Sequence, residues 1–224
     1  MKPPFGIRIK RRIAALRACR SGIALVEFAL CLPVLMTLGM YGIEIAYMAS
    51  VDMQLSQVAL SVADNASRME QTNNSGVTPT VTEADIDSVL DGAMSQGSSF
   101  QLATKGRVIL TSLEMSSTGK QYIHWQRCRG SLVKSSSYGD QGSRNGLTGA
   151  AITGMGKGTN KITASSTTSA VMYAEVYYRY EGIFGDLFVA NKTFKEEAAF
   201  LVRDIRNLTA GVSGSSTKSV CPTT

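Results

Sequence analysis

Apolar residues gather in one long run near the N-terminus. From Ile23 to Ala49 the only charged residues are Glu27 and Glu44. About 20 apolar residues suffice for a helix to cross a bilayer. The run therefore predicts a transmembrane helix over residues 23–49. Pro33 lies inside it, where we expect a kink in the helix rather than a break.

The helical pattern continues beyond the apolar run. Apolar residues recur there at intervals of three and four, with polar residues between them: Val51, Leu55, Val58, Val62, Ala66 and Met69. This spacing is typical of a helix with one buried face. We therefore expect one helix from Ile23 to about Arg68, with its second half packed on a domain. A turn at residues 73–76 follows it.

A second helix is predicted after this turn. Thr82 is a suitable N-cap, and Glu83 and Asp85 place acidic groups in the first turn. The apolar residues that follow share one helical face: Ile86, Val89, Leu90, Ala93 and Met94. Gly97 then ends the helix.

The pattern changes to strands in the second half of the chain. Residues 108–115 and 122–125 flank a Ser-Thr-Gly turn and predict a hairpin. Residues 170–180 and 194–203 alternate and predict two more strands. Strands packed on the outer half of a long helix give an α+β fold class with an antiparallel sheet. The pattern leaves the strand order open.

Two segments lack a regular pattern. Residues 129–169 are rich in Gly and Ser and predict a long surface excursion. The Ser/Thr-rich tail, residues 211–224, is expected to be loosely ordered. The organisation is therefore a leader (1–22), a transmembrane helix (23–49), one domain (50–210) and the tail.

Charge is concentrated at the N-terminus. Residues 1–22 contain seven Lys and Arg and no acid, whereas the whole chain has 23 and 17. Residues 23–224 therefore hold 16 cations against 17 acids, a net charge of −1. The basic cluster adjoins an apolar span, so it is interpreted as a cytoplasmic anchor. No basic stripe with interleaved aromatics follows, so nucleic acid is not an expected partner.

Catalytic patterns are weak. The single histidine, His124, lies on a predicted strand, where packing is the usual role. Residues 154–159 resemble a phosphate loop only in glycine content, because the lysine is misplaced and no strand–loop–helix surrounds it. Two S-x-x-K matches lack their companion motifs. We therefore expect no enzyme activity, no metal and no cofactor.

The start of the apolar run carries a recognisable motif. Gly22, Ile23, the pair Glu27-Phe28 and Pro33 resemble the start of a type IV prepilin. The version R-x-x-R-S-G-I-A-L-V-E-F-A-L-C-L-P-V-L resembles the TadE-like minor pilins, or pseudopilins, of tight-adherence (Tad, type IVc) pilus systems. The close match covers about residues 10–55, and beyond it only length and layout are similar.

The resemblance implies how the chain is processed and where it acts. A prepilin peptidase would cut between Gly22 and Ile23 on the cytoplasmic side of the bacterial inner membrane. The periplasmic, pilin-like domain would later reach the pilus at the cell surface. The implied partners are the lipid bilayer, the Tad assembly platform, other Tad minor pilins and the major Flp-type pilin. Cleavage by a secretory signal peptidase near residues 47–50 is the alternative.

The resemblance also assigns a role to Glu27. This residue would be the fifth of the mature protein, and its carboxylate would compensate the new amino terminus during assembly. A carboxylate near the start of a membrane span is costly when unpaired, which fits that role. The alternative is a solvated acid at the membrane interface.

The implied topology divides the four cysteines. Cys19 would lie in the cytoplasmic leader and Cys31 in the bilayer, whereas Cys128 and Cys221 would face an oxidising periplasm. We therefore expect a Cys128–Cys221 disulfide that ties the tail to the hairpin, with two free thiols as the alternative.

Two functions remain open at this point. The first is a minor pilin that initiates, primes or tips a Tad pilus. The second is an uncleaved, membrane-anchored binding module or tip adhesin. Its contacts would come from the 129–169 excursion and from four strand tyrosines, Tyr173, Tyr177, Tyr178 and Tyr180. For these tyrosines, packing within the sheet is the alternative.

Overall fold

The computed structural model describes most of the chain. The described residues are 21–69, 78–141, 146–190, 192–203 and 206–221. The helices are α2 (Ser21–Ser67), α3 (Glu83–Gln96) and α4 (Leu102–Lys105), with short 3-10 turns η1 (Ser98–Phe100) and η2 (Gly185–Leu187). The strands are β1 (Gly106–Met115), β2 (Gln121–Arg129), β3 (Ala170–Arg179) and β4 (Thr193–Leu201). The chain forms two compact units, and the boundary between them lies between Ala46 and Tyr47.

The N-terminal unit contains the apolar part of α2. This helix is 47 residues long and passes through Pro33 without ending. Its bounds confirm the single helix predicted from Ile23 to about Arg68.

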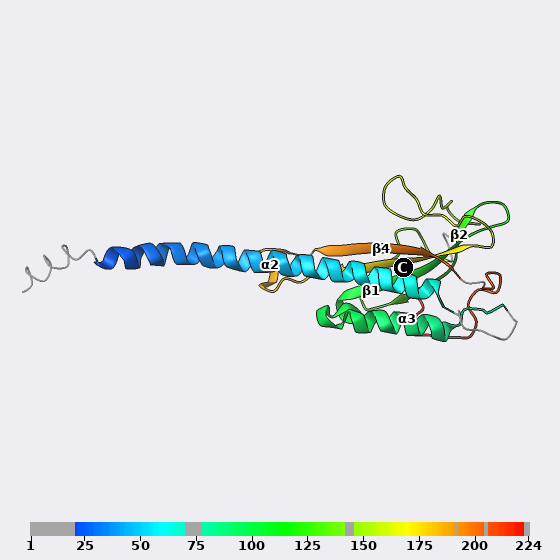
Figure 1. Cartoon of the computed structure of the whole chain (residues 1–224), viewed down its shortest axis with the longest axis horizontal. Helices are drawn as coiled ribbons and strands as arrows, with labels where there is room; N and C mark the ends of the chain where they lie inside the picture. Colours follow the sequence, from blue (N-terminus) through cyan, green and yellow to red (C-terminus); the bar gives the residue numbers. More distant parts are fainter. Residues whose placement is uncertain (1–20, 70–77, 142–145, 191, 204–205, 222–224) are drawn as a thin grey trace, which may run out of the picture. The chain divides into compact units, whose positions relative to one another are not determined.

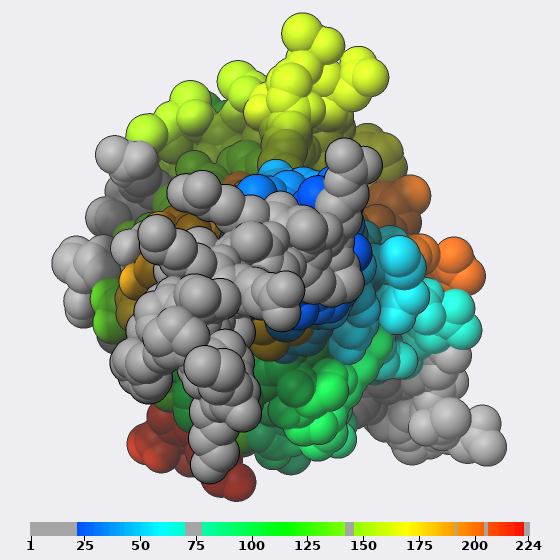
Figure 2. Space-filling model, turned by 90° about the vertical axis from the view of Figure 1, so that its left-hand side faces the viewer, coloured from blue at the N-terminus to red at the C-terminus, as the bar shows by residue number. Residues whose placement is uncertain are grey.

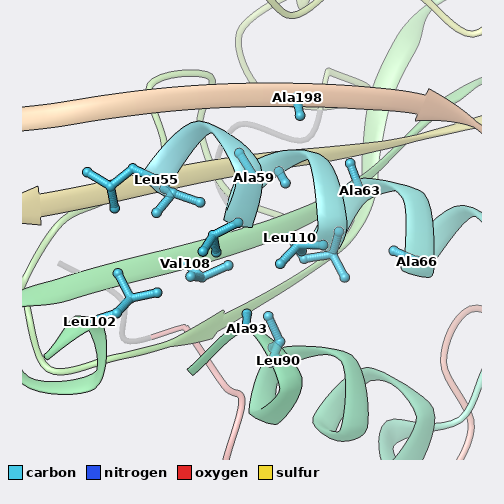
Figure 3. Packing of buried hydrophobic residues seen from close by; sticks show 14 of the residues in the cluster. Leu55, Ala59, Ala63, Ala66, Leu90, Ala93, Leu102, Val108, Leu110 and Ala198 are labelled. Carbon is cyan, nitrogen blue, oxygen red and sulfur yellow. The ribbon is translucent and has the colours of Figure 1, made fainter. Parts of the chain in front are cut away.

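The C-terminal unit, which we call the domain (residues 47–224), is built around the rest of α2. The apolar stripe of α2 is buried against α3 and one face of the sheet, and this stripe includes Leu55, Ala59 and Ala63 (Figure 3). Leu90 of α3 and Leu110 of β1 lie in the same core, and both are fully buried. Burying a side chain of this size contributes about 1.5–3 kcal/mol. Helical packing of α2 and α3 on a sheet confirms the α+β class (Figure 1).

Side chains cap the start of α3 and the end of α2. Thr82 and Asp85 form a reciprocal capping box at the start of α3, which confirms Thr82 as the N-cap. At the end of α2, the guanidinium of Arg206 donates to the carbonyls of Ala66 (3.2 Å), Ser67 (3.0 Å) and Met69 (3.1 Å). A distant cation therefore satisfies carbonyls that the helix leaves open.

All four strands are antiparallel, in the order β2-β1-β3-β4. The hairpin predicted from sequence is β1-β2, and it carries a bulge: Ser112 pairs with Trp125 and Leu113 with Ile123, which leaves His124 as the extra residue. A bulge re-aims the side chain at that position.

The excursion after β2 is anchored to the second face of the sheet. Met155 is fully buried there and packs with Leu113, Ile123 and Tyr173. Regular structure is nearly absent from the described residues between 130 and 169. Yellow-green atoms of this segment project at the edge of the domain (Figure 2).

The described part of the tail, residues 211–221, differs from the loose segment expected. Ser213 forms a parallel bridge with Thr82. Ser219 is completely buried, and its carbonyl accepts a hydrogen bond from the backbone N–H of Cys128 at 2.8 Å. Its hydroxyl, like that of Ser216, donates to Asp87 of α3. The hydroxyl groups that suggested disorder in the sequence therefore hold the tail to α3.

Candidate processing and assembly site

The candidate site is a linear stretch at the start of α2. Gly22, Ile23 and Glu27 lie in its first two turns, and all three are exposed. Glu27 follows Ile23 by four residues, so both lie on the same face of the helix. An amino group created on Ile23 would lie about one helical turn, roughly 5.4 Å, from the Glu27 position.

Packing within the chain does not require a glycine at position 22. A Cβ added to Gly22 would meet no other atom within 4 Å. Its backbone is helical, so no left-handed conformation demands glycine either. Among the described residues, packing therefore gives no reason for glycine at this position.

The helix around the site presents apolar side chains on all sides. Between residues 23 and 38 the large apolar side chains are 40–72% exposed. The most apolar 18-residue window of α2 has a mean hydropathy of 2.1, so the helix is long and apolar enough to cross a membrane. Of the two acids between residues 23 and 49, Glu27 is exposed and Glu44 is buried.

Pro33 modifies the hydrogen bonding of α2. Its ring removes the N–H that would bond to the carbonyl four residues earlier. The Thr37 hydroxyl lies 2.7 Å from the Pro33 carbonyl and 3.0 Å from that of Val34. Such back-bonding often bends a helix. The helix is continuous here, and the kink stays a prediction.

Cys128 and Cys221 form a disulfide in the structure. Their Cα atoms are 4.8 Å apart, and the bridge joins the end of β2 to the tail. Buried Ile109, Leu132 and Tyr177 surround this pair. Cys31 is free and exposed in α2, whereas Cys19 lies outside the described residues.

The structure reveals a buried acid beside the single histidine. Glu114 is 3% exposed, and its carboxylate accepts hydrogen bonds from Ser112 (2.8 Å) and Tyr122 (3.0 Å) and contacts Nδ1 of His124 at 2.9 Å. The hydrogen bond to Glu114 raises the pKa of His124, although burial opposes the shift. Burial and the nearby Glu114 charge raise the pKa of Tyr122 to about 12. The bulge turns His124 toward Glu114, and no pattern in the sequence predicts this bulge.

A second polar network fixes the excursion to the sheet. The ammonium of Lys195 lies 2.5 Å from Glu197 and 3.2 Å from Glu175, and 5.0 Å from the ring centre of Tyr138. Burial alone would lower the pKa of Lys195, but the hydrogen bond with Glu197 and the charge of Glu175 outweigh it and raise that pKa. Tyr138 and Ser136 belong to the excursion, and each bonds to one of these carboxylates.

The four strand tyrosines are not a binding surface. Tyr173, Tyr177, Tyr178 and Tyr180 are each at most 7% exposed. Their place in the core corrects the idea that they contact a ligand, because the apolar faces of β3 pack on both sides. Within the described residues, no cluster of three or more His, Cys, Asp or Glu is arranged to hold a metal.

Within the part of the chain that the structure describes, α2 is the one helix long and apolar enough to cross a membrane, and an α+β domain follows it. Residues 22–64 match the model of the TadE-like protein family. The match begins at Gly22 and includes Glu27 and Pro33, so the resemblance found in the sequence is confirmed over this segment. No curated protein and no solved structure matches the chain.

Proposed function

We propose that the chain is a minor pilin or pseudopilin of a Tad pilus, cut between Gly22 and Ile23 by a prepilin peptidase. The observation that carries the proposal is the TadE-like match, which starts at Gly22 and runs through the apolar helix. Exposure of the cut site and the absence of any packing demand for glycine there support it.

Processing would create the charge pair that assembly needs. The new ammonium of Ile23 and the carboxylate of Glu27 lie on one helical face. In surroundings of low dielectric an unpaired charge is expensive, and a neighbouring opposite charge offsets part of that expense. Glu27 would thus allow the apolar helix to move from the inner membrane into a pilus or its initiation complex, with its domain in the periplasm.

The partners follow from this role. They are the peptidase, the Tad assembly platform, other minor pilins and the major Flp-type pilin, with the bilayer holding the precursor. The role is structural, in initiation, priming or tip formation.

The decisive experiment identifies the first residue of the mature protein. Mass spectrometry of protein purified from the producing bacterium should find Ile23 as the first residue, and Gly22→Val should leave full-length precursor. Gly42→Val is a matched control, because a Cβ there also meets no atom within 4 Å. An intact 1–22 segment in wild-type cells with an active prepilin peptidase would contradict the proposal and favour the uncleaved, anchored binding module.

A further inference from the structure

The connection between β3 and β4 exposes an apolar tip. Ile183 and Leu187 are 51% and 67% exposed. Phe184 and Phe188 are half-buried, and their rings meet edge to face with centres 6.1 Å apart. The short turn η2 lies between them and holds the tip in shape. Because Ile183 and Leu187 lie outside the core and are exposed, their side chains face the surroundings of the domain.

The base of this connection marks one end of the domain. The ring of Tyr180, just after β3, lies 6.0 Å from that of Tyr47. The ammonium of Lys192, just before β4, lies 3.9 Å from the sulfur of Met48. Tyr47 and Met48 are the first residues of the domain, and they lie at the end of the apolar run of residues 23–49. The tip therefore belongs to the end of the domain that chain continuity ties to the candidate span.

We propose that residues 183–188 insert into the lipid interface while the chain is anchored by α2. A bilayer that receives the apolar segment must have its surface close to residues 47 and 48. Tyrosine and lysine at this level, here Tyr47 and Lys192, are typical of membrane interfaces. An aromatic and aliphatic tip beside them adds apolar area that a lipid surface can bury.

The acids of the connection limit how deeply it inserts. Glu181 pairs with Lys105 at 2.7 Å, so its charge is compensated within the domain. Asp186 is exposed at the tip and stays among the headgroups, where a charge is tolerated. The connection is thus a shallow second contact, and it sets the orientation of the domain on the membrane before the chain is extracted.

Tryptophan fluorescence of the full chain in lipid vesicles tests this contact. Leu187→Trp places a reporter at the tip, and the single native tryptophan, Trp125, is 5% exposed and gives a constant background. Leu201→Trp is the matched control, because Leu201 is 54% exposed and ends the same strand that begins near the tip. Nine strand residues separate the two ends by roughly 30 Å.

Brominated phosphatidylcholine should quench the Leu187→Trp signal strongly and shift its emission to the blue, while Leu201→Trp should match wild type. Equal quenching of the two reporters, in protein that resists a carbonate wash, overturns the loop contact and leaves the anchor intact. Release by the wash would refute the anchor on which the contact rests.

A second measurement uses nanodiscs that each hold one copy of the chain. Bromine quenching of the Leu187→Trp signal should persist in them. A blue shift that requires several copies per disc and shows no bromine quenching would instead mean that the tip contacts a second chain.

Discussion

Removing the Cys128–Cys221 bridge should lower the stability of the domain substantially. The bridge closes a loop of 93 residues. In the chain-entropy model a loop of this length stabilises the folded state by about 4–5 kcal/mol, an upper figure for real proteins. For a domain of this size each kcal/mol corresponds to about 2–4 °C in melting temperature. We therefore expect Cys128→Ala/Cys221→Ala to melt up to roughly 10–20 °C lower.

The structure also predicts where the loosening begins. Without the bridge, the tail keeps the backbone bonds of Ser213 with Val81 and Glu83, the hydroxyl bonds to Asp87 and the backbone bond from Cys128 to Ser219. Limited proteolysis of the variant should therefore cut first within residues 211–221. Thermal unfolding and peptide mapping of purified full-length protein in detergent measure both effects.

The controls separate the bridge from the loss of a thiol. Cys31→Ala removes a free, exposed cysteine and should melt like wild type. Reductant should lower the melting temperature of wild type and leave the double variant unchanged. A double variant that melts with wild type and keeps an uncut tail would refute the reasoning. So would labelling of both thiols in native, non-reduced protein exported to the periplasm.

Three further predictions concern charged groups. Glu27→Ala should insert into the membrane and be cut, yet fail to enter the pilus, as fractionation would show; normal piliation with this variant as the only copy would exclude the pairing role. Lys195→Met should cost about 3–5 kcal/mol at pH 7, because buried carboxylates lose their cation; urea unfolding measures this loss, with exposed Lys134→Met as the control. Glu114→Gln should lower the pKa of His124, the single histidine, in proton NMR, whereas Glu181→Gln should not. Because that pKa is raised in the folded state, its stabilisation is present below about pH 6.5 and is lost as pH rises through the folded value.

The helices and strands were predictable because they depend on neighbouring residues. The apolar residues of α2 recur every three or four positions, and the Thr82 N-cap lies just before the helix that it caps. Alternating residues mark the two faces of β3 and β4. Strand order was not predictable, since it depends on contacts between segments that lie far apart in the sequence. The same reason hides the Arg206 cap, whose partners lie about 140 residues earlier.

Predictability of the candidate sites follows the same division. Gly22 and Glu27 form a linear motif, which is visible in the sequence because its residues lie close together along the chain. The His124–Glu114 pair depends on a bulge, and the Lys195 network depends on an excursion folding back onto β3 and β4. The Ser/Thr-rich composition of the tail predicted loose order. In the structure the hydroxyls of Ser216 and Ser219 donate to Asp87, a contact that no local sequence pattern indicates.

Processing and folding are separable in this architecture. Every fully buried apolar residue of α2 lies at Val51 or later, so among the described residues the start of α2 gives no apolar side chain to the core of the domain. The first half of α2 contributes exposed apolar side chains, which only lipid or other apolar helices can cover. If the proposed cut at Gly22 is blocked, we therefore expect the chain to keep its folded domain and its apolar helix and to lack the amino group that Glu27 would face. Defects at Gly22 and Glu27 should accordingly act on assembly, whereas defects at Cys128, Lys195 or Leu55 act on the stability of the domain.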